Sequence, residues 1–156
     1  MEKKKRIEPS QLKSHIGYRM RVVSNAVSHS FARKLAASEV TVAEWVILRE
    51  MYSGEITTSP STVAAITGLT RGAVSKLIDR LLAKNLVSRM EAISDRRYQE
   101  IKLTAKATQL IPKLAIIADE NDKHFFSVLT MSERKSLFEI LTKLANLHEL
   151  NKNPIE

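Results

Sequence analysis

Residues 60–84 constrain the fold of this chain more than any other stretch. Ser59 and Pro60 are typical of a helix start, because serine caps a helix and proline fits its first position. Gly68 then permits the positive φ of a sharp turn, and Thr70 is placed to cap a second helix. The residues that follow place apolar side chains at the 3.6-residue period of an α-helix. The sequence therefore predicts two short helices joined by a tight turn.

The second of these helices has two unlike faces. Its apolar stripe consists of Val74, Leu77, Ile78, Leu81 and Leu82. Its opposite face is small, polar and net basic, with Arg71, Gly72, Ser75, Lys76, Asp79 and Arg80. A helix-turn-helix needs such a second helix, which buries one stripe and offers the other face to a DNA major groove. An ordinary helical hairpin inside a core is the alternative interpretation.

The positive charge of the chain is concentrated in two segments. The net charge is +8; residues 1–34 hold nine Lys or Arg and two acids, and residues 71–106 hold nine and four. A localised basic surface suits a polyanionic partner such as double-stranded DNA, although a solubilising surface has the same charge. Residues 1–10, which include four consecutive basic side chains, are expected to be a disordered basic tail.

The composition argues against several other classes of protein. The chain lacks cysteine, which excludes disulfides, thiol catalysis and cysteine-zinc sites. Its four glycines are scattered, and its four histidines do not have the spacing of a metal site, so we expect no enzyme, no cofactor and no metal. No apolar run is long enough to span a membrane and no secretory signal is recognisable, which favours a cytoplasmic protein.

Helices are expected on both sides of the helix-turn-helix. Residues 11–38 show the apolar period of a long helix, and such a helix often packs on another chain. The capping box formed by Thr41 and Glu44 opens a short helix. Residues 105–150 are expected to hold two further helices with apolar stripes.

Two strands are predicted directly after the helix-turn-helix. They cover residues 86–90 and 98–103, and a polar, basic loop separates them. A two-stranded ribbon with arginines at its tip can reach a minor groove beside the major groove that the helix reads. Residues 40–104 are therefore expected to form a winged helix-turn-helix, and the fold class is mainly α with a small β wing.

This order of elements, and three motifs within it, resemble the MarR family of bacterial transcription regulators. The motifs are Val40–Met51, Ser61–Arg89 and Ser94–Ala107, the last of which holds an aspartate-arginine-arginine run in the predicted wing. The resemblance covers nearly the whole chain, residues 11–150. It implies a winged helix-turn-helix core flanked by N- and C-terminal dimerisation helices. It also implies a homodimer that binds a pseudo-palindromic operator in double-stranded DNA, most often as a repressor.

The resemblance, together with hydroxyl groups at two helix N-termini, assigns roles to individual residues. The expected DNA-binding residues are Ser59, Ser61, Thr70, Arg71, Gly72, Ser75, Lys76, Arg96 and Arg97. Asp79 is expected to pair with the wing arginine Arg97, and Asp95 to brace the wing loop. The open alternative is a winged-helix protein-interaction module without specific DNA binding.

Many relatives bind a small aromatic or phenolic effector, which weakens DNA binding. The resemblance implies a pocket between the dimerisation helices and the DNA-binding lobe. Its candidate residues here are His15, Tyr18, Arg19 and Trp45. Tyr18 and Arg19 suit a carboxylate or a phenol, but the same residues are equally suited to packing the helix junction.

Overall fold

The computed structural model describes residues 8–54, 57–91 and 99–155. Within these residues it contains six α-helices, two short 3-10 helices and three strands. The α-helices are α1 (Ile16–Ala36), α2 (Val42–Ser53), α3 (Pro60–Thr67), α4 (Arg71–Ala83), α5 (Ala105–Phe125) and α6 (Met131–Leu147). The 3-10 helices are η1 (Leu12–Ser14) and η2 (Phe126–Val128). The strands are β1 (Thr57–Thr58), β2 (Val87–Glu91) and β3 (Gln99–Leu103).

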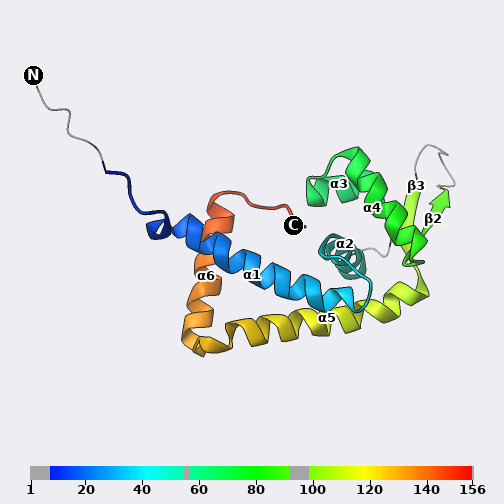
Figure 1. Cartoon of the computed structure of the whole chain (residues 1–156). Helices are drawn as coiled ribbons and strands as arrows, with labels where there is room; N and C mark the ends of the chain where they lie inside the picture. The colour runs from blue at the N-terminus through cyan, green and yellow to red at the C-terminus, as the bar shows by residue number, and fades with distance from the viewer. Residues whose placement is uncertain (1–7, 55–56, 92–98, 156) are drawn as a thin grey trace, which may run out of the picture.

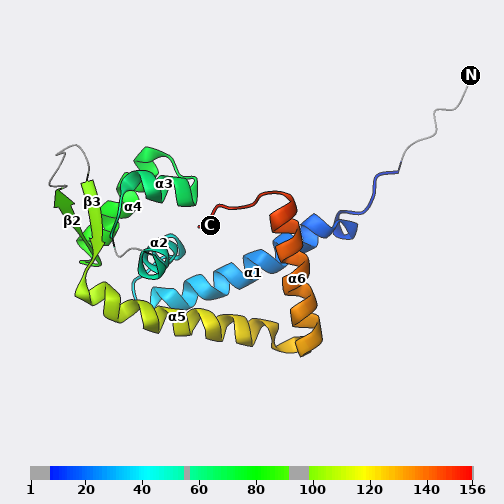
Figure 2. The same cartoon turned by 180° about the vertical axis from the view of Figure 1, so that it is seen from behind.

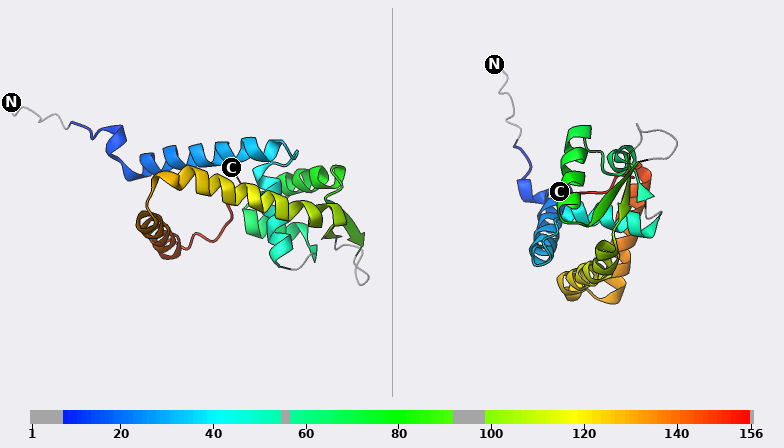
Figure 3. Two further views of the ribbon diagram at one scale, coloured as in Figure 1. Left: turned by 90° about the horizontal axis from the view of Figure 1, so that it is seen from below. Right: turned by 90° about the vertical axis from the view of Figure 1, so that its right-hand side faces the viewer.

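The elements form two regions (Figure 1, Figure 2). The winged helix, from α2 to β3, lies at one end, and α6 lies at the other. The long helices α1 and α5 lie side by side between them (Figure 3), and we refer to α1, α5 and α6 together as the helical arm. The predicted fold class, mainly α with a small β wing, is confirmed.

The start of α1 differs from the prediction of a helix over residues 11–38. Leu12–Ser14 form a 3-10 turn, His15 is extended with φ −80° and ψ 127°, and the α-helix begins at Ile16. The hydroxyl of Ser14 donates to the carbonyl of Gln11 at 2.6 Å, a local bond that competes with regular helix formation. The apolar period was continuous across this break, so periodicity alone did not reveal it.

The predicted ribbon is confirmed, and the structure adds a third strand. The sheet is antiparallel with the order β1-β3-β2, and Val87 pairs with Leu103 in its register. The two residues of β1 are too few to show the alternation from which strands are predicted. The wing loop, including Asp95, Arg96 and Arg97, lies outside the described residues.

The hydrophobic core lies within the winged helix and extends along α5. The predicted α4 stripe is confirmed at Val74, Leu77, Ile78 and Leu81, all buried, whereas Leu82 is half-buried. Leu35 at the end of α1 and Leu114 in α5 are also buried in the same cluster. The helical arm therefore contacts the winged helix through continuous apolar packing. Burial of this kind is the main stabilising term in folding.

The predicted helix starts are confirmed in detail. The side chains of Ser59 and Thr70 each accept a hydrogen bond from a backbone N–H three residues on, and Thr41 forms a capping box with Glu44. Gly68 adopts φ 71°, the left-handed conformation that glycine tolerates best. In the described part of the chain, no helix is both long and apolar enough to cross a membrane.

Candidate nucleic-acid interface

The exposed face of α4 holds four of the nine predicted DNA-binding residues. Arg71, Gly72, Ser75 and Lys76 are all exposed, while the opposite stripe of the same helix is buried. A Cβ built on Gly72 would meet nothing within 4 Å, so this glycine is not required by packing and leaves the first turn open. The helix N-terminus contributes partial positive charge beside these cationic side chains. This face is chemically suited to an anionic partner.

The N-terminal end of α3 lies next to this face. The Ser59 hydroxyl caps α3 by accepting from the Thr62 N–H at 3.2 Å, and its oxygen lies 2.8 Å from the Ser61 oxygen. A surface pocket between α3, α4 and β3 is lined by Ser59, Ser61 and Arg71 together with Gln99. The structure therefore brings the α3 hydroxyls and the α4 cation to one surface.

Asp79 pairs with a residue that the sequence did not single out. The Nη2 atom of Arg89, in β2, donates to Oδ1 of Asp79 at 2.8 Å. The predicted partner, Arg97, lies outside the described residues. An exposed pair like this contributes only about 0–1 kcal/mol to stability, so its main effect is to fix the wing strand against α4. In the sequence, Arg89 is one of 25 lysine and arginine residues, and only its place in the strand after the helix could have indicated that it pairs with Asp79.

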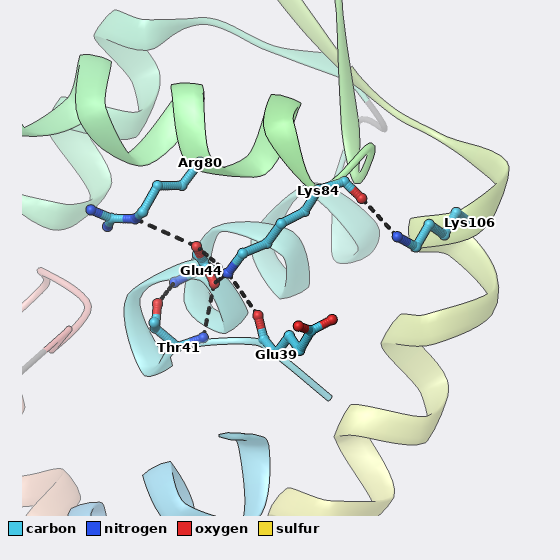
Figure 4. Close-up of polar contacts among 6 residues, drawn as sticks. All are labelled: Glu39, Thr41, Glu44, Arg80, Lys84 and Lys106. Atoms are coloured by element: carbon cyan, nitrogen blue, oxygen red, sulfur yellow. Dashed lines mark hydrogen bonds and ion pairs between the residues drawn. The ribbon is translucent and has the colours of Figure 1, made fainter. Parts of the chain in front are cut away.

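A buried carboxylate lies behind α4, where Glu44 of α2 faces the C-terminal half of that helix (Figure 4). Its side chain is fully buried, and its oxygens accept from Lys84 Nζ at 2.8 and 2.7 Å and from the Thr41 N–H at 2.9 Å. Arg80 Nε lies 3.5 Å away. Burial by itself raises the pKa of Glu44, but the bonds from Lys84 and Thr41 outweigh it and hold the pKa below its usual value.

Lys84 extends this cluster to two other segments, the turn before α2 and helix α5. Its ammonium group also donates to the Glu39 carbonyl at 2.6 Å, and Lys106 of α5 donates to the Lys84 carbonyl at 2.8 Å. Glu44 was predicted only as a capping residue. Its second role was not visible because Lys84 lies 40 residues away in the sequence.

One chain does not bring the four candidate ligand residues together. His15, Tyr18 and Arg19 lie at the start of α1, whereas Trp45 packs edge to face on Phe31, with ring centroids 6.2 Å apart. Phe31 is 13 residues beyond Tyr18, about 20 Å along the helix at 1.5 Å per residue. A pocket containing all four residues therefore requires a second chain.

An apolar groove of 680 Å³ lies at the free end of the arm, and Arg19 is the predicted ligand residue among those that line it. Its walls come from α1, η2 and α6, including Met20, Val23 and Leu141. Among the residues that the structure describes, no group of three His, Asp or Glu side chains is placed to hold a metal ion.

Comparison with known proteins found one family model and several solved structures that are similar to this chain. A model of the MarR family matches residues 38–97, which include α2, α3, α4 and β2. Among solved structures, a mutant of MarR from E. coli complexed with operator DNA is 21% identical with a TM-score of 0.74, covering 86% of this chain and 99% of that chain.

Two further solved structures share the fold over most of both chains. BpsR from Bordetella bronchiseptica, whose DNA binding is regulated by 6-hydroxynicotinic acid, is 22% identical with a TM-score of 0.75, covering 88% of this chain and 98% of that chain. The organohalide-sensing regulator RdhR-CbdbA1625, bound to 2,4-dichlorophenol, is 20% identical with a TM-score of 0.78, covering 99% and 96%. The MarR-family model therefore matches the winged helix, and the solved structures share the fold of the winged helix and the arm.

Proposed function

We propose that this protein is a sequence-specific transcription regulator of the cytoplasm that binds double-stranded DNA as a homodimer and represses transcription. The observation that carries the proposal is the two-faced helix α4. Its buried stripe holds it in the core, while Arg71, Ser75 and Lys76 are exposed together on the side away from that core. A helix of this kind can enter a major groove with its N-terminal side chains on the base edges.

Different parts of the interface have different roles in this proposal. Arg71, Ser75 and Lys76 read bases, and Gly72 lets the backbone approach them closely. Ser61 and Thr70 lie at helix N-termini and face phosphates, while Ser59 orders the α3 end as its cap. Arg96 and Arg97 in the wing enter the adjacent minor groove. Asp79 and Asp95 brace the helix and the wing.

Apolar exposure on the arm supports the homodimer. Ile16 is 76% exposed, Phe138 72% and Leu147 72%, and no residue of α6 is buried. Contiguous apolar surface of this extent is rare on a monomer. A second copy covering this surface would place two α4 helices on one side of the dimer, as a pseudo-palindromic operator requires.

The effector in this proposal is a small aromatic or phenolic molecule. Two structural neighbours, BpsR and RdhR-CbdbA1625, are associated with ligands of this chemistry. Here Tyr18, Arg19 and His15 of one chain would supply polar contacts, and Trp45 of the other an aromatic wall. Because the pocket joins both chains to the lobe, its occupant can change the spacing of the two α4 helices.

The test is fluorescence anisotropy on duplex DNA from the upstream region of its own gene, beside an unrelated duplex. We expect a preference of about a thousandfold for the upstream duplex, within the range of specific regulators. If the dimer neutralises about eight phosphates, log K should fall with log salt at a slope near −7. Equal and weak binding to both duplexes would contradict autoregulation and would favour the protein-interaction module, which a pull-down would then examine.

A further inference from the structure

We propose that Lys84 and Glu44 are a positioning pair that sets the orientation of α4, so that DNA specificity depends on two residues that do not touch DNA. This inference rests on the proposed function, because it concerns what holds the DNA-reading helix in place. Neither residue belongs to the exposed face of α4, and the pair lies at the opposite end of that helix from Arg71.

Each N–H donor of the Lys84 ammonium group has an acceptor within hydrogen-bond distance. A lysine ammonium has three N–H donors. In this structure three acceptors lie around the nitrogen: both oxygens of Glu44, at 2.8 and 2.7 Å, and the Glu39 carbonyl, at 2.6 Å. The end of α4 is therefore tied at one point to α2 and to the turn before it.

A further bond connects the same residue to the helical arm. Lys106, in the first turn of α5, donates to the carbonyl of Lys84 at 2.8 Å. Figure 4 shows the consequence: Glu39, Glu44 and Lys106, from three segments, converge on one residue of α4. Movement of α2 or α5 is therefore passed to the recognition helix at this residue.

Because Glu44 is buried, its charge depends on the nearby cation for stability. The Glu44 side chain is completely buried, and a buried charge that loses its partner is strongly destabilised. Arg80 is the other cation placed near Glu44 by the described residues, but it is half-exposed and lies at 3.5 Å. Without Lys84, Arg80 is the cation that the described residues leave near Glu44. We expect the end of α4 to shift as these two groups approach, which would move the DNA-facing side chains as well.

The geometry of the helix amplifies such a change. Arg71 lies 13 residues from Lys84, which is about 20 Å along the helix axis. A tilt of about 10° at the Lys84 end therefore moves Arg71 by about 3 Å, whereas a functional site tolerates about 0.5 Å. Contacts with bases should suffer more than contacts with phosphates, because phosphate contacts are less directional.

The experiment compares five variants, including K84R, on a duplex that the wild-type protein has selected from a random-sequence pool and on a scrambled duplex. K84M keeps the length of the side chain but removes the ammonium. E44Q keeps an oxygen to accept from the Thr41 N–H and removes the charge. The double variant removes both charges. K34M is the matched control, because Lys34 donates to buried Asn121 at 3.0 Å between α1 and α5, away from α4.

We expect K84M to lower the ratio of selected to scrambled affinity by at least about tenfold, the size of one lost base contact. K84R, which retains a cation, should restore most of the ratio. The double variant separates positioning from stability: it no longer buries an unpaired charge, so its Tm should recover relative to K84M while its ratio stays low. K34M should lower Tm and leave the ratio unchanged.

Two results would overturn the inference by itself, and two further outcomes are also distinguished. If K84M keeps the wild-type ratio, the pair does not position α4. If the ratio recovers together with Tm in the double variant, the pair has only a structural role. If K84M does not fold, E44Q and the double variant decide by the same two criteria. If the wild-type protein selects no duplex at all, the proposed function fails and this inference with it, an outcome that differs visibly from the other three.

Discussion

Helices α4 and α6 are both amphipathic, yet only one of them is buried by its own chain. In α4, four of 13 residues are buried, and they face the core of the winged helix. In α6, none of 17 residues is buried, and Phe138, Ile140 and Leu147 are more than half exposed. The winged helix therefore completes its core within one chain, whereas the arm presents an apolar surface that the described part of its own chain leaves uncovered, as expected if a second copy covers it.

The largest effect that would test this difference comes from placing negative charges on the apolar surface of α6. We predict that L141E combined with L144E abolishes dimerisation, because a carboxylate buried in an apolar interface without a partner is very unfavourable. Sedimentation should show a monomer, and affinity for the selected duplex should fall by at least about hundredfold, since one half-site then binds alone. If the protein with both substitutions is still a dimer, α6 does not form the interface.

The matched control for that experiment is K113E. Lys113 lies on an exposed part of α5, and its substitution also changes charge without placing it on the apolar surface. It should leave the oligomeric state unchanged.

A core substitution should affect the winged helix in a different way. We predict that L77A lowers the free energy of unfolding by about 2–5 kcal/mol, the usual cost of removing a buried leucine side chain. Urea unfolding measures it. L147A, in the arm, should lose stability only to the extent that the dimer dissociates, so its effect should depend on protein concentration. Equal concentration dependence of the two losses would remove the distinction between the regions.

The sequence predicted both helices equally well, and this is why it could not predict the difference between them. An apolar period identifies which face is covered, but not whether the cover comes from the same chain. The local signals were reliable: Ser59, Thr70 and Gly68 act as predicted, because caps and turns are determined by neighbouring residues.

Contacts between distant residues were not predictable in the same way. Glu44 was identified from its spacing to Thr41, but the pairing with Lys84 joins positions 40 residues apart. Arg89 and Asp79, ten residues apart, meet only because the chain reverses after α4. In the candidate ligand site, His15 and Trp45 were grouped by resemblance, and the structure shows that one chain separates them.

Lowering the pH should weaken the winged helix through Glu44. Its pKa is held below the usual value in the folded protein, so the ionised carboxylate contributes stability above its unfolded pKa, near 4.5. That contribution is lost as the pH falls through the lower, folded pKa. The stability difference between the wild type and E44Q should therefore shrink below about pH 4.5. Urea unfolding at several pH values measures it, and a difference that grows towards acid would contradict the pairing.

The smallest predicted effect concerns a contact between the C-terminal tail, which follows α6, and the winged helix. After α6 the chain returns towards α3 (Figure 1), and the Asn153 N–H donates to the Ile66 carbonyl at 3.0 Å. That carbonyl belongs to the last turn of α3, which leaves its carbonyls without partners inside the helix. The Lys152 side chain lies over Gly68, where its positive charge interacts favourably with the partial negative charge at the C-terminal end of α3.

N153P removes this single donor while keeping the chain length. We predict a loss of about 1 kcal/mol in the free energy of unfolding, the net worth of one hydrogen bond. N151A, at an exposed position in the same tail, is the control and should be neutral. Because the contact involves α3 and not the apolar surface of α6, the loss in N153P should not depend on protein concentration. A concentration-dependent loss would instead indicate that the tail contributes to the dimer interface. The tail would then belong with the helical arm and not with the winged helix.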